Sequence, residues 1–166
     1  MRCLAVGLVL LFPVELPAQQ LGGVSLRLGE SQGAVLERLV QYKLTQRSGS
    51  IGFWSVSDTT KWKSGLNYGN VGTIQFLSGR LVSVNRAWES TARDGMAAAN
   101  TIMAALRQLE GNSGCTVVSQ RPLPSPEARA DLVSVICGDH EIMIGLSDQE
   151  GGRYYQINES WLHRNH

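Results

Sequence analysis

The chain has 166 residues and a formal net charge of +1, with 43% hydrophobic and 17% charged residues. This composition is that of a globular domain with enough apolar side chains to build a core. The near-neutral charge and the lack of a Lys/Arg block argue against a phosphate-binding surface, so nucleic acid is not expected as a partner.

Residues 1–18 have the layout of a secretory signal peptide. Arg2 supplies a positive charge, an apolar run covers 4–14, and 16–18 ends in a small residue. The apolar run is short for a bilayer span, and no later stretch approaches the necessary length. We therefore expect cleavage after this segment, a periplasmic or secreted location, and a single domain over 19–166 without a membrane span.

The first part of that domain predicts a strand, a helix and a second strand. Residues 24–28 alternate apolar and polar side chains, as a strand does, and Ser31 is placed to cap a helix whose apolar positions run to Val40. The segment 42–46 alternates again and fits either the end of that helix or the start of a strand. Bulky side chains at 51–57 predict another strand.

A loop and a hairpin come next. The polar segment 58–70 predicts a long loop. The segments 71–77 and 80–88 carry alternating apolar side chains on either side of Ser78-Gly79. That pattern is typical of a β-hairpin with a two-residue turn.

The second half predicts another helix and a further group of strands. Ser90-Thr91 with Asp94 resembles a capping box. The apolar face expected for the helix that follows is formed by Met96, Ala99, Met103 and Leu106. The strands expected after it are 115–120, 131–137, 141–146 and 154–158, with Gly138-Asp139-His140 as a hairpin turn.

This order of elements predicts an α+β fold. We expect a two-layer sandwich, with a mainly antiparallel sheet and two helices packed on one face. Trp88 and Trp161 each lie beside Glu-Ser or Ser, which suggests a weak internal repeat of 24–90 and 91–162. The shared sequence is too short to separate duplication from chance.

Two cysteines, Cys115 and Cys137, remain once the signal peptide with Cys3 is removed. In an oxidising compartment such a pair is expected to form a disulfide. Closing a loop of this length stabilises the fold by about 3 kcal/mol through the unfolded state. A reactive thiol pair has little support, because the spacing is not Cys-x-x-Cys.

The sequence carries no recognisable catalytic signature. There is no Gly-x-Ser-x-Gly elbow, zinc-protease helix or phosphate-binding loop, so we expect no catalytic residue, cofactor or metal. His140, between Asp139 and Glu141, is the one alternative: the trio would suit a metal or acid–base role, and it is also ordinary turn composition.

Aromatic residues are the stronger candidates for binding. Trp62 lies between two lysines in the predicted 58–70 loop, and Trp54 and Tyr68 would extend the same surface. A tryptophan on a loop is suited to protein or glycan contacts. The alternative is that Trp62 folds back onto the sheet and that each of these rings packs in the core.

One resemblance covers residues 24–90. Leu28-Gly29-Glu30-Ser31-Gln32-Gly33-Ala34-Val35 opens a helix, Phe53-Trp54 follows, and Ile74-Gln75-Phe76 leads through Val84 to Trp88. This pattern resembles the SmpA/OmlA-type and β-lactamase-inhibitor-like modules of bacterial envelopes, which share a Gly-x-Ser/Thr helix start and a Phe-x-x-Gly hairpin. The resemblance implies a binding module.

The sequence therefore predicts an exported, non-catalytic binding or envelope-associated module. The expected partner is another envelope or secreted protein, and nothing indicates an oligomeric state. Two alternatives remain. The first is an inhibitor of an exported hydrolase that inserts the 58–70 loop with Trp62 into its target. The second is a small hydrolase or metal-binding protein that uses His140.

Overall fold

The computed structural model describes residues 18–61, 69–88, 95–120, 129–149 and 152–162. The predicted signal peptide, apart from Ala18, lies outside these residues. The helices and strands in chain order are β1 (Gln19–Leu21), β2 (Val24–Leu26), α1 (Gln32–Arg38), β3 (Lys43–Gln46), β4 (Phe53–Ser57), β5 (Asn70–Leu77), β6 (Arg80–Ala87), α2 (Gly95–Leu106), β7 (Thr116–Gln120), β8 (Arg129–Cys137), β9 (His140–Gln149) and β10 (Gly152–Leu162). Single 3₁₀ turns cover Thr59–Lys61 and Arg107–Leu109.

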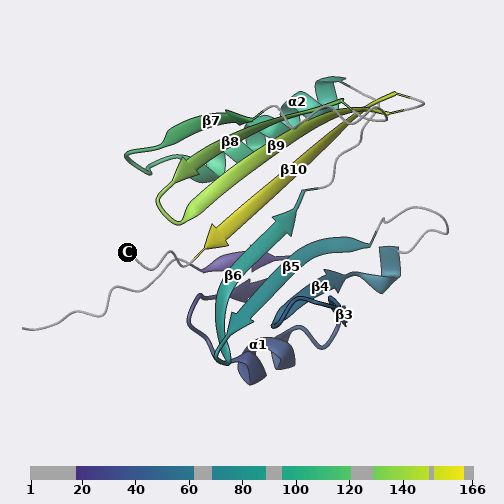
Figure 1. Ribbon diagram of the computed structural model, residues 1–166, viewed down its shortest axis with the longest axis vertical. Helices are drawn as coiled ribbons and strands as arrows, with labels where there is room; N and C mark the ends of the chain where they lie inside the picture. The colour runs from purple at the N-terminus through teal and green to yellow at the C-terminus, as the bar shows by residue number, and fades with distance from the viewer. Residues whose placement is uncertain (1–17, 62–68, 89–94, 121–128, 150–151, 163–166) are drawn as a thin grey trace, which may run out of the picture.

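The fold is built around one eight-stranded antiparallel sheet in the order β3-β4-β5-β6-β10-β9-β8-β7 (Figure 1). Strands β3–β6 form one half and β7–β10 the other. The halves join where β6 pairs with β10, from Asn158 opposite Ala87 to Leu162 opposite Ser83. The mainly antiparallel sheet and the two helices confirm the coarse prediction. Each half consists of a helix followed by four strands, while a duplication stays a prediction.

Both predicted hairpins are present, and their turns explain why. Ser78 and Gly79 have φ values of 50° and 73°, which is the left-handed backbone that a type I′ turn between two strands requires. Gly138-Asp139 joins β8 to β9, with Cys137 opposite His140. The prediction that His140 lies in the turn is therefore wrong, because it is the first residue of β9.

The first helix begins as predicted. The Ser31 side chain accepts a hydrogen bond from the backbone N–H of Ala34 at 3.4 Å, and Val35 and Leu39 are fully buried. The helix ends at Arg38, so Val40 is 84% exposed and is not part of its apolar face, contrary to the prediction. The ambiguous segment 42–46 forms strand β3.

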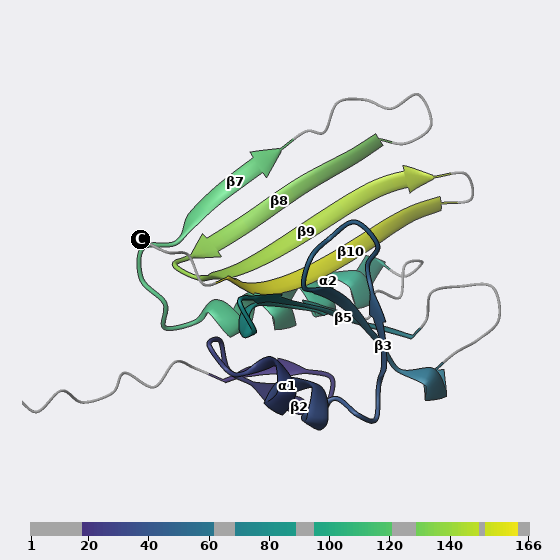
Figure 2. The same ribbon diagram turned by 60° about the horizontal axis from the view of Figure 1, so that its bottom comes forward.

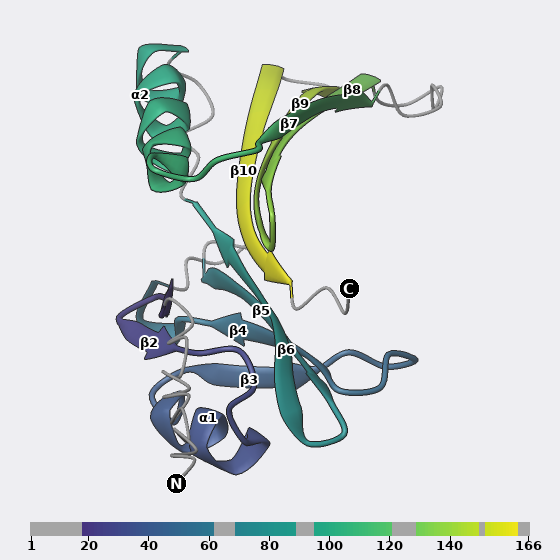
Figure 3. The same ribbon diagram turned by 90° about the vertical axis from the view of Figure 1, so that its left-hand side faces the viewer.

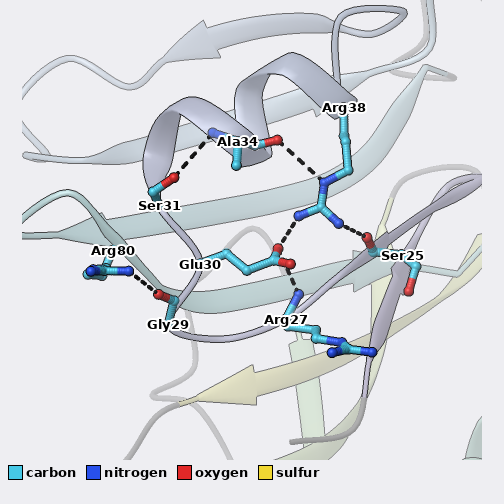
Figure 4. Close-up of polar contacts among 8 residues, drawn as sticks. All are labelled: Ser25, Arg27, Gly29, Glu30, Ser31, Ala34, Arg38 and Arg80. Atoms are coloured by element: carbon cyan, nitrogen blue, oxygen red, sulfur yellow. Dashed lines mark hydrogen bonds and ion pairs between the residues drawn. The ribbon is translucent and has the colours of Figure 1, made fainter. Parts of the chain in front are cut away.

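A polar network holds the segment between β2 and α1 (Figure 4). The Glu30 carboxylate accepts a hydrogen bond from the backbone N–H of Arg27 at 3.1 Å and contacts the guanidinium of Arg38. Arg38 in turn donates to the backbone carbonyl of Ser25 at 2.7 Å. Arg38, at the end of α1, thus links the β1–β2 hairpin to the segment that leads into the helix.

Replacement of Ser31 by alanine is expected to lower the free energy of unfolding by about 1 kcal/mol, because α1 then loses the acceptor for one of its first N–H groups. Urea denaturation followed by circular dichroism measures this difference. Ser48→Ala, at an exposed turn residue, serves as the control and should leave the midpoint unchanged. Equal midpoints for both variants would show that the cap adds nothing.

The second helix is present, but its buried face differs from the predicted one. Ala98 and Ala105 are buried, as is Leu109 in the 3₁₀ turn that follows the helix, whereas Met96 and Met103 are 70% and 53% exposed. Alanine, which is small and apolar, occupies many positions of α2, so its faces differ little in hydrophobicity. The predicted capping box at 90–94 lies outside the described residues. Figure 3 shows α2 beside β10.

Buried side chains form two clusters, one for each half of the sheet. The first cluster is Leu21, Val24, Leu26, Leu28, Val35, Leu39, Val56, Ile74, Phe76, Leu81 and Val84. The second cluster is Ala105, Leu109, Cys137, Ile142 and Ile157. The β1–β2 hairpin supplies fully buried leucines to the first cluster. Strand β1 was missed from the sequence because it is short and starts at the predicted cleavage point.

The remaining strand predictions hold, with longer bounds for the last one. Strands β7, β8 and β9 match the segments expected at 115–120, 131–137 and 141–146. The closing strand expected at 154–158 extends to Leu162 in the structure. No helix among the described residues has both the length and the apolar character needed to cross a membrane.

Candidate functional site

Glu159 is the one buried acidic residue among the described part of the chain, with 1% of its surface exposed. It lies on β10, directly opposite Arg86 of β6 and Ile142 of β9. Side chains alternate between the two faces of a strand, so Glu159 shares a face with Ile157 and Trp161. A carboxylate in this position is stable only if protein groups replace the lost water.

Three side chains supply those interactions. The indole Nε1–H of Trp88 donates to Glu159 Oε2 at 3.0 Å, and His140 Nε2 lies 2.9 Å from Oε1. Arg86 Nη1 is 3.7 Å from Oε2 and provides the opposite charge. Both oxygens of the carboxylate are therefore engaged, and a cation compensates its charge.

Two tryptophan rings contact the basic partners of Glu159. The guanidinium carbon of Arg86 lies 4.2 Å from the centre of the Trp88 ring, which is a cation–π contact. The rings of His140 and Trp161 stack with centres 4.9 Å apart and planes inclined by 16°. We refer to Arg86, Trp88, His140, Glu159 and Trp161 as the Arg86–Glu159 cluster.

The cluster lies at the junction of the two halves of the sheet. Arg86 is near the end of β6 and Trp88 directly follows that strand, while His140 comes from β9 and Glu159 and Trp161 come from β10. Trp161 packs against the first core cluster and Trp88 against the second. The cluster therefore ties together, through polar contacts, two apolar cores that are otherwise separate.

In the Arg86–Glu159 cluster, the polar atoms of Glu159 already have partners within the protein. The Nε2 atom of His140 is occupied by Glu159, and Ser160, which follows Glu159 in the sequence, lies on the opposite face of β10. There its Oγ accepts a hydrogen bond from Asn85 at 2.9 Å. The described residues include no group of three or more His, Cys, Asp or Glu arranged to hold a metal ion.

The trio predicted around His140 does not converge. Glu141 follows His140 on β9 and points to the other face of the sheet, while Asp139 stays in the turn. The carboxylate that His140 meets comes instead from β10, 19 residues further along the chain. The prediction recognised a histidine with an acidic partner but assigned the wrong partner, because contacts across a sheet are not local in sequence.

The predicted aromatic residues do not form one described surface. Trp54 is half-buried on β4 and packs against the first core cluster. Its Nε1 atom has no hydrogen-bond partner among the described residues. Trp62 and Tyr68 lie outside the described residues. The base of their loop is described: the Asp58 N–H donates to the Gly69 carbonyl at 2.6 Å.

The predicted disulfide is confirmed. Cys115 and Cys137 are bonded, with sulfur atoms 2.01 Å apart. The bridge connects the segment just before β7 to the last residue of β8. Cys115 is exposed and Cys137 is buried in the second core cluster. Its role in this structure is to fasten the outermost strand.

Sequence reasoning missed Glu159 and Arg86. A signal for Glu159 was present, because Tyr155, Ile157, Glu159 and Trp161 occupy alternate positions. Extending the predicted strand beyond residue 158 would have placed this carboxylate among apolar neighbours. Arg86 carried no comparable signal, since an arginine at a strand end is ordinary.

Comparison with known proteins adds no relative: no protein-family model, curated protein or solved structure matches the chain. The resemblance of residues 24–90 to bacterial envelope modules therefore stays a prediction.

Proposed function

We propose that this protein is an exported, non-catalytic binding module that docks a partner protein on one face of its sheet. Export is supported by the signal-peptide layout of residues 1–18 and by the Cys115–Cys137 disulfide, which fits an oxidising compartment. The non-catalytic role is supported by the closed hydrogen bonding of the Arg86–Glu159 cluster.

The finer architecture belongs to the same proposal: two layers, with α1, α2 and the β1–β2 hairpin against a single face. The strand register supports it. Ile74 of the first core cluster pairs with Val84, and Val84 pairs with Trp161. Trp161 and Ile157 share a side of β10 by alternation, so both core clusters point to the same side of the sheet. In this arrangement none of the described helices covers the opposite face.

That opposite face carries the observation on which the proposal rests. Across the central strands it presents mostly uncharged hydroxyl and amide side chains, together with Phe53, which pairs with Gln75. We call the hydroxyl and amide set the polar face; it consists of Ser55, Thr73, Gln75, Ser83, Asn85 and Asn158. Thr73 pairs with both Ser55 and Asn85, and Gln75 pairs with Ser83, so these groups are continuous from β4 to β6.

Such a surface is suited to recognition of a protein. Hydroxyls and amides both donate and accept hydrogen bonds, and they avoid the large desolvation penalty of buried charges. Binding surfaces rich in serine and asparagine use this adaptability. The rigid sheet also keeps the groups in fixed positions, which limits the entropy lost on binding.

A charge placed on the polar face should disrupt binding. We expect Ser83→Arg, in the tagged full chain expressed in its native host, to reduce capture of the partner at least tenfold, since a long cation would then separate the surfaces. Asn100→Arg, on the exposed side of α2, is the matched control and should retain capture. The proposal fails if both variants capture the same protein equally well.

An inhibitor of an exported hydrolase is the second candidate. It is favoured by the base of the 58–70 loop, where Asp58 Oδ1 accepts hydrogen bonds from the Thr60 N–H and hydroxyl at 2.9 and 2.7 Å. This geometry fixes the start of a segment that contains Trp62. In the same capture experiment, Trp62→Ala rather than Ser83→Arg would then abolish binding, and the captured protein would be a hydrolase.

A further inference from the structure

Strand β7 is an outer edge of the sheet, and its own residues include none of the charges that commonly protect such an edge. It pairs with β8 on one side and is the last strand in the sheet order (Figure 2). Its sequence, Thr-Val-Val-Ser-Gln, contains no charge and no proline. Val117 and Val118 are 71% and 37% exposed, and they point to opposite faces. Exposed edges of this kind are templates for pairing with another strand.

The register shows which backbone groups of β7 face outward. A two-residue hairpin turn closes with a hydrogen-bonded pair, here Cys137 and His140, so Cys137 directs its N–H and C=O toward β9. Alternation along β8 then directs Ser134 toward β7, where it pairs with Val118. The N–H and C=O groups of the two neighbours of Val118, Val117 and Ser119, therefore point away from the sheet.

Strand β3, the other outer strand of the sheet, carries a positive charge. Strand β3 contains Lys43, and Arg47 follows its last residue. Positive charges at an edge discourage strand addition. Within Thr116–Gln120 strand β7 has no charged residue, although Arg121 follows its last residue as Arg47 follows that of β3. Among the described residues, α2 contacts β10 and β9.

We propose that β7 pairs with β7 of a second copy of this chain, antiparallel and centred on Val118. In this register the outward groups of Val117 in one copy bond to those of Ser119 in the other, which gives four hydrogen bonds about the two-fold axis. The two Val118 side chains meet as a non-hydrogen-bonded pair, where side chains approach most closely.

A second copy is the occupant favoured by the charge of the molecule. The chain has a formal net charge of +1, so two copies repel each other weakly. An uncharged strand with β-branched side chains also needs a partner of the same character, and β7 itself supplies one. The disulfide at Cys115 and Cys137 keeps β7 on its own sheet and thus available as a template.

The association state of the mature full chain tests this inference. We expect a dimer that dissociates on dilution between about 1 mM and 1 μM in light scattering, as for a small interface. Val118→Lys should weaken the dimer at least tenfold, because it places like charges opposite each other. Ile51→Lys, at a residue that is 94% exposed elsewhere, should leave the dimer unchanged.

A second variant keeps the test decisive if Val118→Lys fails to fold. Val118→Cys should form a reducible cross-linked dimer under mild oxidation, because the Cβ atoms of a non-hydrogen-bonded pair approach to about 4.5 Å, the upper end of the range that a disulfide spans. A monomer across the whole concentration range, or a dimer unaffected by Val118→Lys, overturns the inference. Neither outcome bears on the polar face, because Ser83 is not part of β7.

Discussion

Replacement of Glu159 by alanine is expected to lower the free energy of unfolding by about 3–5 kcal/mol. The substitution leaves the Trp88 indole N–H and His140 Nε2 without their acceptor and removes the negative charge beside Arg86. Each buried donor left unsatisfied costs about 1–3 kcal/mol. Urea denaturation monitored by tryptophan fluorescence measures the change, and Trp88 and Trp161 report on the site itself.

A conservative variant separates charge from shape. Glu159→Gln keeps the volume and one acceptor, so its loss should be smaller than that of the alanine variant. Glu37→Gln, at an exposed residue of α1, controls for the loss of a carboxylate and should leave the unfolding midpoint unchanged. If Glu159→Ala unfolds at the same midpoint as Glu37→Gln, the Arg86–Glu159 cluster does not hold the two halves together.

Removal of the disulfide should have the second-largest effect. The double variant Cys115→Ala/Cys137→Ala opens a loop whose ends are separated by 22 residues. The unfolded chain then gains conformational freedom equivalent to about 3 kcal/mol. Hydrogen exchange should also rise first in β7, which is held to the sheet by β8 on one side and by this bridge. Calorimetry and exchange measured by mass spectrometry test both effects.

The oxidation state of Cys115 and Cys137 also tests whether the protein is exported to an oxidising compartment. Protein purified from its native host under acidic trapping conditions should begin at Gln19 and contain no alkylatable thiol. Material with both thiols free would contradict the proposal that the chain is exported. An unchanged unfolding free energy in the double variant, by contrast, would contradict only the stabilising role of the bridge.

The hairpins could be predicted from the sequence because their determinants are local. Ser78-Gly79 and Gly138-Asp139 specify their turns with two residues each, and the alternating flanks fix which side chains share a face. The disulfide followed from the number of cysteines and the expected compartment. Ser31 marked the start of α1 because an N-cap is also a local feature.

The Arg86–Glu159 cluster could not be predicted, because it depends on which distant strands become neighbours. The sequence places Arg86 and Glu159 far apart, and only the pairing of β6 with β10 brings them together. The buried face of α2 was misplaced for another reason. When most positions are apolar, the face that packs is selected by the sheet below it, and Met103 was left exposed.

The polar face and the Arg86–Glu159 cluster have complementary roles in this account. The cluster fixes the junction of β6 and β10 on the packed side, and the polar face crosses the same junction on the other side through Asn85 and Asn158. A rigid junction presents these amides with little freedom to lose on binding. In the proposed function, partner recognition and stability therefore depend on different residues of the same two strands.

Photo-crosslinking from the centre of the polar face tests the proposed function most directly. A photoreactive amino acid is introduced at Gln75 in the full chain, which is then expressed in its native host and irradiated. The account predicts a covalent adduct with one partner protein at this position and none when the same amino acid replaces Asn100 on α2. Adducts at position 100 with none at position 75 would contradict it.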